Sequence, residues 1–237
     1  VSNLAKADGA SVKVVAIWKP VSYTVRYEGN GAGGTMNQSF VYDEEQQLAT
    51  NKFERVGYTF AGWSTEKNGA AVYVDGELAG NLTATGNKAT LYAAWKANEY
   101  TVTYDAGSDA AEGEMASETY AYGTYWTMPE CRFEWPGHAF LGWAKKGEKS
   151  VRWKGGAEVS DLAKEDGARV AVVAIWSTAT YAVQYEGNGA TSGAMGDQSF
   201  VYGEAQQLAT NVFKRVGYTF EGWAESENGN KKYDNLQ

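Results

Sequence analysis

One short aromatic phrase recurs three times along the chain at a fixed interval. It reads GYTFAGW at residues 57–63, GHAFLGW at residues 137–143 and GYTFEGW at residues 217–223. The tryptophans that end these phrases, Trp63, Trp143 and Trp223, stand 80 residues apart. A fixed period is typical of tandem modules that each bury their own core. We therefore expect the 237 residues to form three small modules, with these tryptophans in the cores.

Alternating aromatic and β-branched residues predict a mostly β module. Tyr23, Val25 and Tyr27 alternate with polar residues, which is the pattern of a half-buried strand. Glycine-rich breaks separate this segment from the later strand candidates. Those candidates cover residues 38–44, 57–63 and 89–95.

Two finer expectations concern the middle of each period. Strict alternation in residues 57–63 places Phe60 and Trp63 on opposite faces of a strand. Residues 44–48, EEQQL, include good helix formers and predict one or two helical turns. The expected fold class is therefore α+β, mostly β, built from tandem modules.

The repeats also set the expected domain boundaries. Residues 23–95 form module 1 and residues 100–176 form module 2, which is divergent. Residues 181–237 form module 3, which lacks a closing strand. Residues 1–18 match the closing strand of a module whose beginning is absent.

A spare closing strand at one end and an open module at the other suggest two arrangements. Residues 1–18 could complete module 3 of a neighbouring copy by strand addition, in a head-to-tail arrangement. They could also complete module 3 of their own chain, which would close the chain into a ring. The short linkers favour the head-to-tail arrangement. The alternative is that both ends of the sequence are only the boundaries of a fragment taken from a longer array of modules.

The repeated segments resemble the Listeria–Bacteroides repeat, the B repeat of internalin-type surface proteins. The resemblance rests on YTVRYEGNGAGGTM, QSFVYDEEQQL, FERVGYTFAGWST and LYAAW, and it covers almost the whole chain. It implies a small β-grasp-like module that is strung in tandem on bacterial cell-surface proteins. It implies no catalysis, and a role as stalk, spacer or adhesive module.

Composition narrows the classes of partner. A net charge of −8 argues against nucleic acid or an anionic membrane surface. No apolar run approaches the roughly 18 residues that span a bilayer, so we expect no membrane insertion. The single cysteine, Cys131, suits a bacterial surface protein or a cytosolic one. With the resemblance, the expected location is extracellular, at the bacterial cell surface or cell wall.

Residues for catalysis or metal binding are scarce. The chain has one histidine, His138, and one cysteine, so zinc-ligand spacing cannot be assembled. A Cys131–His138 pair is conceivable, but the other modules carry Asn51 and Asn211 at the cysteine position. We therefore expect no enzyme activity, no cofactor and no metal.

Module 2 departs from its neighbours at a few aromatic positions. Trp126 stands where the other modules have Gln46 and Gln206. Trp135 replaces Arg55 and Arg215, and His138 replaces Tyr58 and Tyr218. Polar residues in two copies predict exposed positions, so Tyr125, Trp126, Trp135 and His138 form a candidate patch. Three explanations stay open: a patch for a glycan or host ligand, a contact between neighbouring modules, or local repacking.

Overall fold

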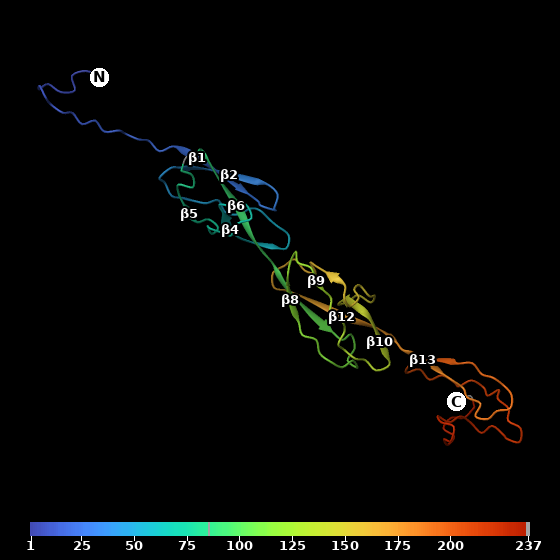
Figure 1. Ribbon diagram of the computed structural model, residues 1–237. Coiled ribbons are helices and arrows are strands. Elements are labelled where there is room, and N and C mark those ends of the chain that lie inside the picture. Colours follow the sequence, from blue (N-terminus) through green and yellow to red (C-terminus); the bar gives the residue numbers. More distant parts are fainter. Residues whose placement is uncertain (85, 236–237) are drawn as a thin grey trace. The chain divides into compact units, whose positions relative to one another are not determined.

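The computed structural model describes residues 1–84 and 86–235 (Figure 1). It separates into two compact units. One unit holds Val1–Glu99 with Lys164–Asp166, and therefore contains module 1. The other holds Tyr100–Ala163 with Gly167–Gln237, and contains module 3 and most of module 2.

Module 1 is a four-stranded sheet with a short separate ladder. Its strands are β1 (Ser22–Glu28), β2 (Thr35–Val41), β3 (Gln46–Gln47), β4 (Tyr58–Ser64), β5 (Leu78–Ala79) and β6 (Lys88–Ala97). The sheet order is β2-β1-β6-β4, and β3 pairs with β5. The opening strand β1 runs parallel to the closing strand β6, whereas β2 and β4 are antiparallel to their neighbours. The closing strand therefore lies inside the sheet, between β1 and β4.

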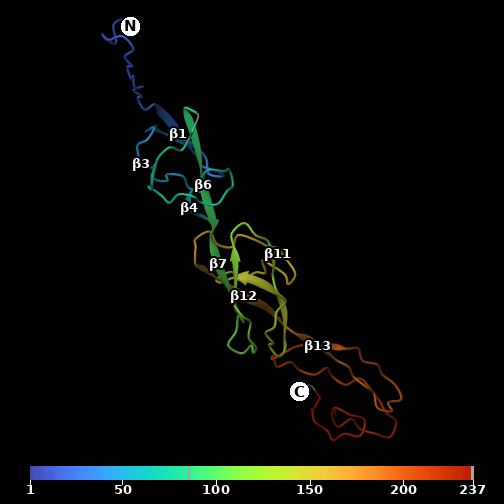
Figure 2. The same cartoon turned by 60° about the vertical axis from the view of Figure 1, so that its left-hand side comes forward.

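Module 2 repeats this arrangement. Its strands are β7 (Glu99–Asp105), β8 (Glu118–Ala121), β9 (Trp126–Thr127), β10 (His138–Lys145), β11 (Glu158–Val159) and β12 (Ala168–Thr178). The order is β10-β12-β7-β8, with β12 parallel to β7 and antiparallel to β10. Figure 2 shows β6 of module 1 leading directly into β7.

Module 3 keeps only part of the pattern. The strands β13 (Thr180–Val183) and β14 (Gln198–Val201) pair antiparallel. The segment that matches β4 and β10 contributes an isolated bridge between Trp223 and Tyr233. In modules 1 and 2, one edge of the opening strand, β1 or β7, pairs with the closing strand. Within the described residues, the equivalent edge of β13 is unpaired.

The mostly β expectation is confirmed, but the expected helix at residues 44–48 is wrong. The described residues contain no helix, and this segment carries the short strand β3. The side-chain Oε1 of Gln46 accepts a hydrogen bond from the backbone nitrogen of Val41 at 2.9 Å. Leu48 then pairs its backbone nitrogen with the carbonyl oxygen of Glu77 at 2.8 Å. Pairing with a distant segment therefore outweighs the weak helix propensity of these residues. The α+β class and the β-grasp-like description of the module are not confirmed.

The strict alternation expected in residues 57–63 is also wrong. A β-bulge interrupts the pairing of β4 with β6 between Phe60 and Gly62, so Phe60 and Trp63 both face the core. Their ring centroids lie 5.0 Å apart. Gly62 has a φ of +134°, and a Cβ there would lie 2.4 Å from the carbonyl oxygen of Tyr73. Glycine is therefore required for the turn of the strand and for the close approach of the neighbouring backbone.

Buried tryptophans form the centres of modules 1 and 2, as expected. Trp63 and Trp143 are both 0% exposed. The ring of Trp63 packs edge-on against Tyr27, with centroids 4.7 Å apart, and Trp143 contacts Tyr104 at 5.4 Å. Trp223 keeps the same contact with Tyr185 at 4.8 Å but remains partly exposed. The core prediction is thus confirmed for two modules and only partly for the third.

We expect Trp63→Ala to unfold module 1. Truncating a buried aromatic costs about 3–5 kcal/mol, a large share of the stability of a small module. Trp223→Ala should cost less, because part of that ring is already in solvent. Hydrogen exchange read out on peptides from each module measures both effects. Equal loss of protection in the two variants would contradict the difference in burial.

Gly62→Ala tests the bulge. We expect a cost of about 1–3 kcal/mol or more, because alanine tolerates this positive φ poorly and its Cβ meets a backbone oxygen. Gly33→Ala is the matched control, since nothing lies within 4 Å of a Cβ at that position. Thermal unfolding of the two variants should separate them. A similar melting temperature for both would show that the bulge is not needed.

Candidate functional site in module 2

Trp126 lies in the core of module 2, so the expectation that it is exposed is wrong. The residue is 9% exposed, and its ring stacks on Tyr120 with centroids 4.0 Å apart. Its Nε1 donates a hydrogen bond to the hydroxyl of Tyr100 at 3.1 Å. Indoles can donate but cannot accept, so Trp126 cannot replace the glutamines of the other modules, which accept from backbone nitrogens. It instead buries its large ring beside another aromatic.

The hydroxyl of Tyr120 is held in the neutral form. Burial, and secondly the hydrogen bond to the Glu118 carboxylate, raise the pKa of Tyr120.

Tyr125 is next to Trp126 in sequence but, unlike it, is 72% exposed. The structure thus separates the two adjacent aromatics, one inside and one outside.

Trp135 and His138 come together as a stacked pair. Their ring centroids lie 3.6 Å apart, with planes inclined by 12°. The pair replaces a cation–π contact of the other modules, in which Arg55 lies 3.8 Å over Tyr58 and Arg215 lies 4.0 Å over Tyr218. Both residues of the module 2 pair are half-buried. The two substitutions therefore compensate each other and retain the stack.

Two further aromatics border this pair, and the sequence reasoning missed them. Trp176 meets Trp135 edge-on at 6.0 Å, and Tyr202 of module 3 meets His138 edge-on at 6.4 Å. A Cβ on Gly137 would lie 2.0 Å from Tyr202. The recurrence of a tryptophan at the position of Trp176 in the repeats could have indicated that this residue packs near the stack. No sequence pattern indicates the contact of Tyr202, because it joins segments of two modules within one compact unit.

The candidate patch is therefore divided. The contacts place Trp135 and His138 with Trp176, whereas Trp126 packs with Tyr100 and Tyr120. Local repacking explains Trp126. Ligand binding by Tyr125, Trp135 and His138 stays a prediction.

The arrangement of Cys131 does not favour nucleophilic chemistry. Burial raises the pKa of the Cys131 thiol, which donates weakly to the carbonyl oxygen of Phe133 at 3.7 Å. A thiol kept protonated is a poor nucleophile. His138 has its Nδ1 3.2 Å from the carbonyl oxygen of Pro136. In residues 1–84 and 86–235, no group of three or more His, Cys, Asp or Glu residues could hold a metal ion.

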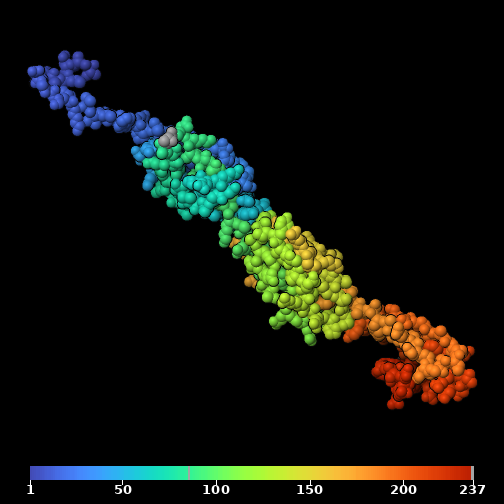
Figure 3. Space-filling view, in the orientation of Figure 1, coloured from blue at the N-terminus to red at the C-terminus, as the bar shows by residue number. Residues whose placement is uncertain are grey.

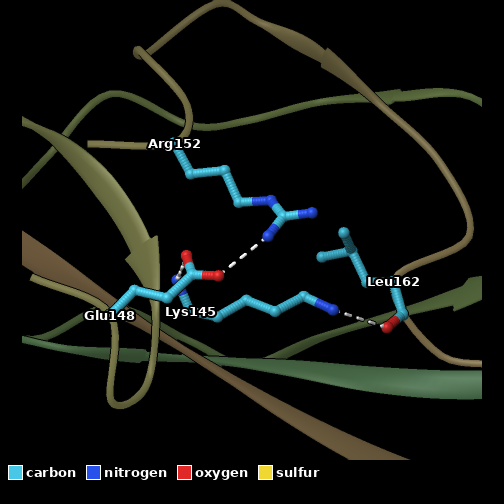
Figure 4. Close-up of polar contacts among 4 residues, drawn as sticks. All are labelled: Lys145, Glu148, Arg152 and Leu162. Atoms are coloured by element: carbon cyan, nitrogen blue, oxygen red, sulfur yellow. Dashed lines mark hydrogen bonds and ion pairs between the residues drawn. The ribbon is translucent and has the colours of Figure 1, made fainter. Parts of the chain in front are cut away.

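A charged network lies at the turn after β10 (Figure 4). Glu148 accepts hydrogen bonds from the backbone nitrogen of Lys145 at 3.1 Å and from Arg152 at 2.8 Å. The hydrogen bond from the Lys145 backbone nitrogen, followed by the one from Arg152, lowers the pKa of the Glu148 carboxyl. Lys145 Nζ donates to the carbonyl oxygen of Leu162 at 3.2 Å. The Glu148 and Arg152 side chains are largely exposed, so their ion pair contributes little to stability.

The comparisons with known proteins identify the family. The profile described as the Listeria-Bacteroides repeat domain matches residues 23–94, 100–163 and 181–237. The chain therefore belongs to the Listeria-Bacteroides repeat family, whose repeats occur in surface proteins and are a non-catalytic module type. The resemblance noted from the sequence is confirmed.

Two proteins of Evansella cellulosilytica are similar to this chain. One, titled "Putative membrane protein", is 29% identical over 226 residues, which cover 92% of this chain and 31% of that protein. The other, titled "Putative Gly-rich membrane protein", is 27% identical over 177 residues, covering 73% and 20%. The chain thus spans less than a third of either relative. In the described part of this chain, no helix has the length and apolarity to cross a membrane.

Acrylamide quenching tests the burial of Trp126. We expect the fluorescence lost in Trp126→Phe to be as shielded as that lost in Trp143→Phe. Trp18→Phe is the matched control, because Trp18 is 88% exposed and its signal should quench readily. Quenching of the Trp126 signal at the rate of Trp18 would contradict its place in the core.

Proposed function

We propose that this chain is a non-catalytic spacer segment of a bacterial cell-surface or cell-wall protein, holding other parts of that protein away from the envelope. Its membership of a repeat family found in surface proteins supports the location. The acidic balance, with a net charge of −8, suits a solvated segment with little attraction to anionic polymers.

The observation that carries the proposal is the parallel pairing of the opening and closing strands. In module 1, Thr24 through Glu28 of β1 pair in parallel with Lys88 through Tyr92 of β6. In module 2, β7 and β12 pair in the same way. Tension that enters at the start of β1 and leaves at the end of β6 loads this ladder in shear. Many hydrogen bonds must then break together, which resists extension better than unzipping them one at a time.

The connections between modules suit the same role. Only Asn98 stands between β6 and β7, and only Ala179 between β12 and β13. A connection of one residue transmits force from one closing strand to the next opening strand with little slack.

Both connecting residues are anchored by hydrogen bonds. The buried Asn98 donates its backbone nitrogen to the Gly57 carbonyl at 2.9 Å and accepts from Thr59 Oγ1 at 2.6 Å. Its Nδ2 donates to the carbonyl oxygen of Lys164, in the same compact unit, at 2.7 Å. Ala179 repeats the first contact by donating to Gly137 at 2.8 Å.

Single-molecule force spectroscopy of the full chain, pulled from its ends, tests the spacer role. We expect two high-force unfolding events, from modules 1 and 2. Ala89→Pro removes a donor from the β1–β6 ladder, because Thr24 is in register with Lys88, donates to Asn87 at 2.9 Å and bonds in a parallel ladder to the residues on either side of its partner. It should lower the force of one event and leave the other as an internal control. Uniformly low unfolding forces would overturn the spacer role under tension.

A binding role is the second candidate, and the side chains of Tyr125, Trp135 and His138 support it. Tyr125 is exposed, and the Trp135–His138 stack is half-buried at the surface of module 2. Aromatic faces of this kind can stack on sugar rings. The segment would then act as an adhesive module for a carbohydrate or mucin on a host surface.

A glycan array with the full chain separates this candidate from the spacer role. The double variant Trp135→Arg with His138→Tyr restores the pair found in modules 1 and 3, and should fold. If the Trp135–His138 stack binds glycans, we expect the signal to fall at least tenfold in this variant, and Tyr125→Ala tests separately whether Tyr125 takes part. Absence of any glycan signal from the unaltered chain would contradict the adhesive role without affecting the spacer role.

A further inference from the structure

Glutamine side chains cover the outer edge of the sheet in modules 1 and 3. In module 1, Gln46 accepts a hydrogen bond at 2.9 Å from the backbone nitrogen of Val41, in the edge strand β2. Gln38 of the same strand donates its Nε2 to the carbonyl oxygen of Gln47 at 2.8 Å. Two glutamines therefore tie the edge strand to the segment beside it. The equivalent pairs of module 3 make both contacts, at 2.7 and 2.8 Å: Val201 with Gln206, and Gln198 with Gln207.

Module 2 has neither glutamine. Glu118 takes the place of Gln38, and Trp126 takes that of Gln46. A carboxylate has no hydrogen to donate, and the indole of Trp126 has no acceptor. Within the described part of the chain, no side chain accepts from the backbone nitrogen of Ala121, which stands at the position that Gln46 covers in module 1. The edge that glutamines cover in modules 1 and 3 is therefore open in module 2.

The strand at this open edge is β8, the last in the order β10-β12-β7-β8. Backbone groups of an antiparallel edge strand face its neighbour and solvent in alternation. Thr119 and Ala121 occupy the positions of Ser39 and Val41, and Val41 directs its nitrogen away from the sheet. The carbonyl oxygen of Ala121 accepts from the backbone nitrogen of Thr124 at 3.3 Å. The nitrogens of Thr119 and Ala121 and the carbonyl oxygen of Thr119 are thus left for an added strand.

The open edge lies in an acidic stretch of the chain. Residues 105–131 contain six Asp and Glu residues and no Lys or Arg. Figure 3 shows this stretch, in light green, at the surface of module 2. Asp105 lies 4.0 Å from Lys146, but within the residues that the structure describes no cation pairs with the others. These exposed carboxylates attract a positively charged partner to the edge: Asp109, Glu112, Glu114, Glu118 and Glu130.

We propose that β8 binds an extended, lysine- or arginine-bearing segment of another protein, which adds to module 2 as a new edge strand. The backbone of this segment pairs with the free groups of Thr119 and Ala121, and its cationic side chains face Glu118 and the neighbouring carboxylates. Strand addition gives affinity through backbone hydrogen bonds and specificity through alternate side chains. The proposal does not depend on the spacer role, because it concerns one edge of one module.

The charge of the stretch favours a different protein over a second copy as the occupant. Pairing β8 with β8 of another copy would bring two acidic stretches together, and like charges repel across an interface. A basic segment is attracted by the same charges. The strand β8 covers Glu118–Ala121, so the added ladder is short. We therefore expect weak binding that rising salt weakens further.

Amide hydrogen exchange of the full chain tests whether the edge is open. After correction for the intrinsic exchange rate at each position, we expect the Ala121 amide to exchange about tenfold faster than the Val41 and Val201 amides. Those two amides donate to glutamine side chains, whereas the Ala121 amide has no such acceptor. Equal protection of the three amides would overturn the proposal, because the edge of module 2 would then be covered like the others.

A synthetic peptide, KTVKVTK, tests the binding, with ETVEVTE as its charge-reversed counterpart. Fluorescence anisotropy of the labelled peptides is measured against the full chain at low salt. We expect the lysine peptide to bind and to slow the exchange of the Thr119 and Ala121 amides, and the glutamate peptide to do neither. Equal binding of the two peptides, or binding without slower exchange at β8, would overturn the proposal.

Two proline variants of unchanged net charge separate strand addition from simple charge attraction. Ala121→Pro removes the free donor of β8, and proline is tolerated where an edge nitrogen faces solvent. Ala116→Pro is the matched control, since Ala116 is exposed and precedes the strand. We expect binding of the lysine peptide to weaken about tenfold in Ala121→Pro and to stay within about twofold in Ala116→Pro. Equal affinity of the two variants would overturn the proposal.

Light scattering without peptide tests the other occupant. We expect the mass to stay at the 25.7 kDa of one copy as concentration rises. A larger mass that Ala121→Pro returns to one copy would identify a second copy as the occupant of β8, and would overturn the proposed basic partner.

Discussion

The closing strand is the element on which each complete module depends. β6 and β12 lie inside their sheets, so each supplies backbone hydrogen bonds to two neighbours at once. Their inward side chains, among them Leu91 and Val172, fill the space beside the buried tryptophans. In module 3, Tyr181 and Phe220 repeat aromatics of module 1 in sequence but are 50% and 39% exposed, whereas Tyr185 and Phe200 are buried. The same strand is followed, after a single residue, by the opening strand of the next module.

The Gly-Trp pair that recurs in β4 and β10 builds that core. The bulge before the glycine changes the side-chain parity of the strand, so an aromatic and the tryptophan reach the same side. The positive φ of Gly62 and Gly142, and the backbone oxygen beside each, exclude larger residues. The motif therefore serves packing, and the buried rings of Trp63 and Trp143 are not available to stack on a ligand.

Module 2 shows how far a repeat can diverge while keeping its frame. The stacked pair survives a change from Arg and Tyr to Trp and His, since either combination packs two flat groups face to face. Trp126 replaces a glutamine that accepts a backbone hydrogen bond, and its ring instead packs on Tyr120. Polar counterparts in sister modules were thus a poor guide to its exposure, because a larger side chain can turn toward the core.

The sequence by itself determined the period, the main strands, the family and the burial of Trp63 and Trp143. These follow from local alternation and from repetition, both of which are visible along one chain. Tertiary structure alone decided that residues 44–48 form a strand, that β4 carries a bulge, and that Trp126 is buried. It also decided that Trp135 and His138 lie together with Trp176 and Tyr202. The physical reason is common to all of these: each depends on a partner far away in the sequence, and a local pattern carries no information about that partner.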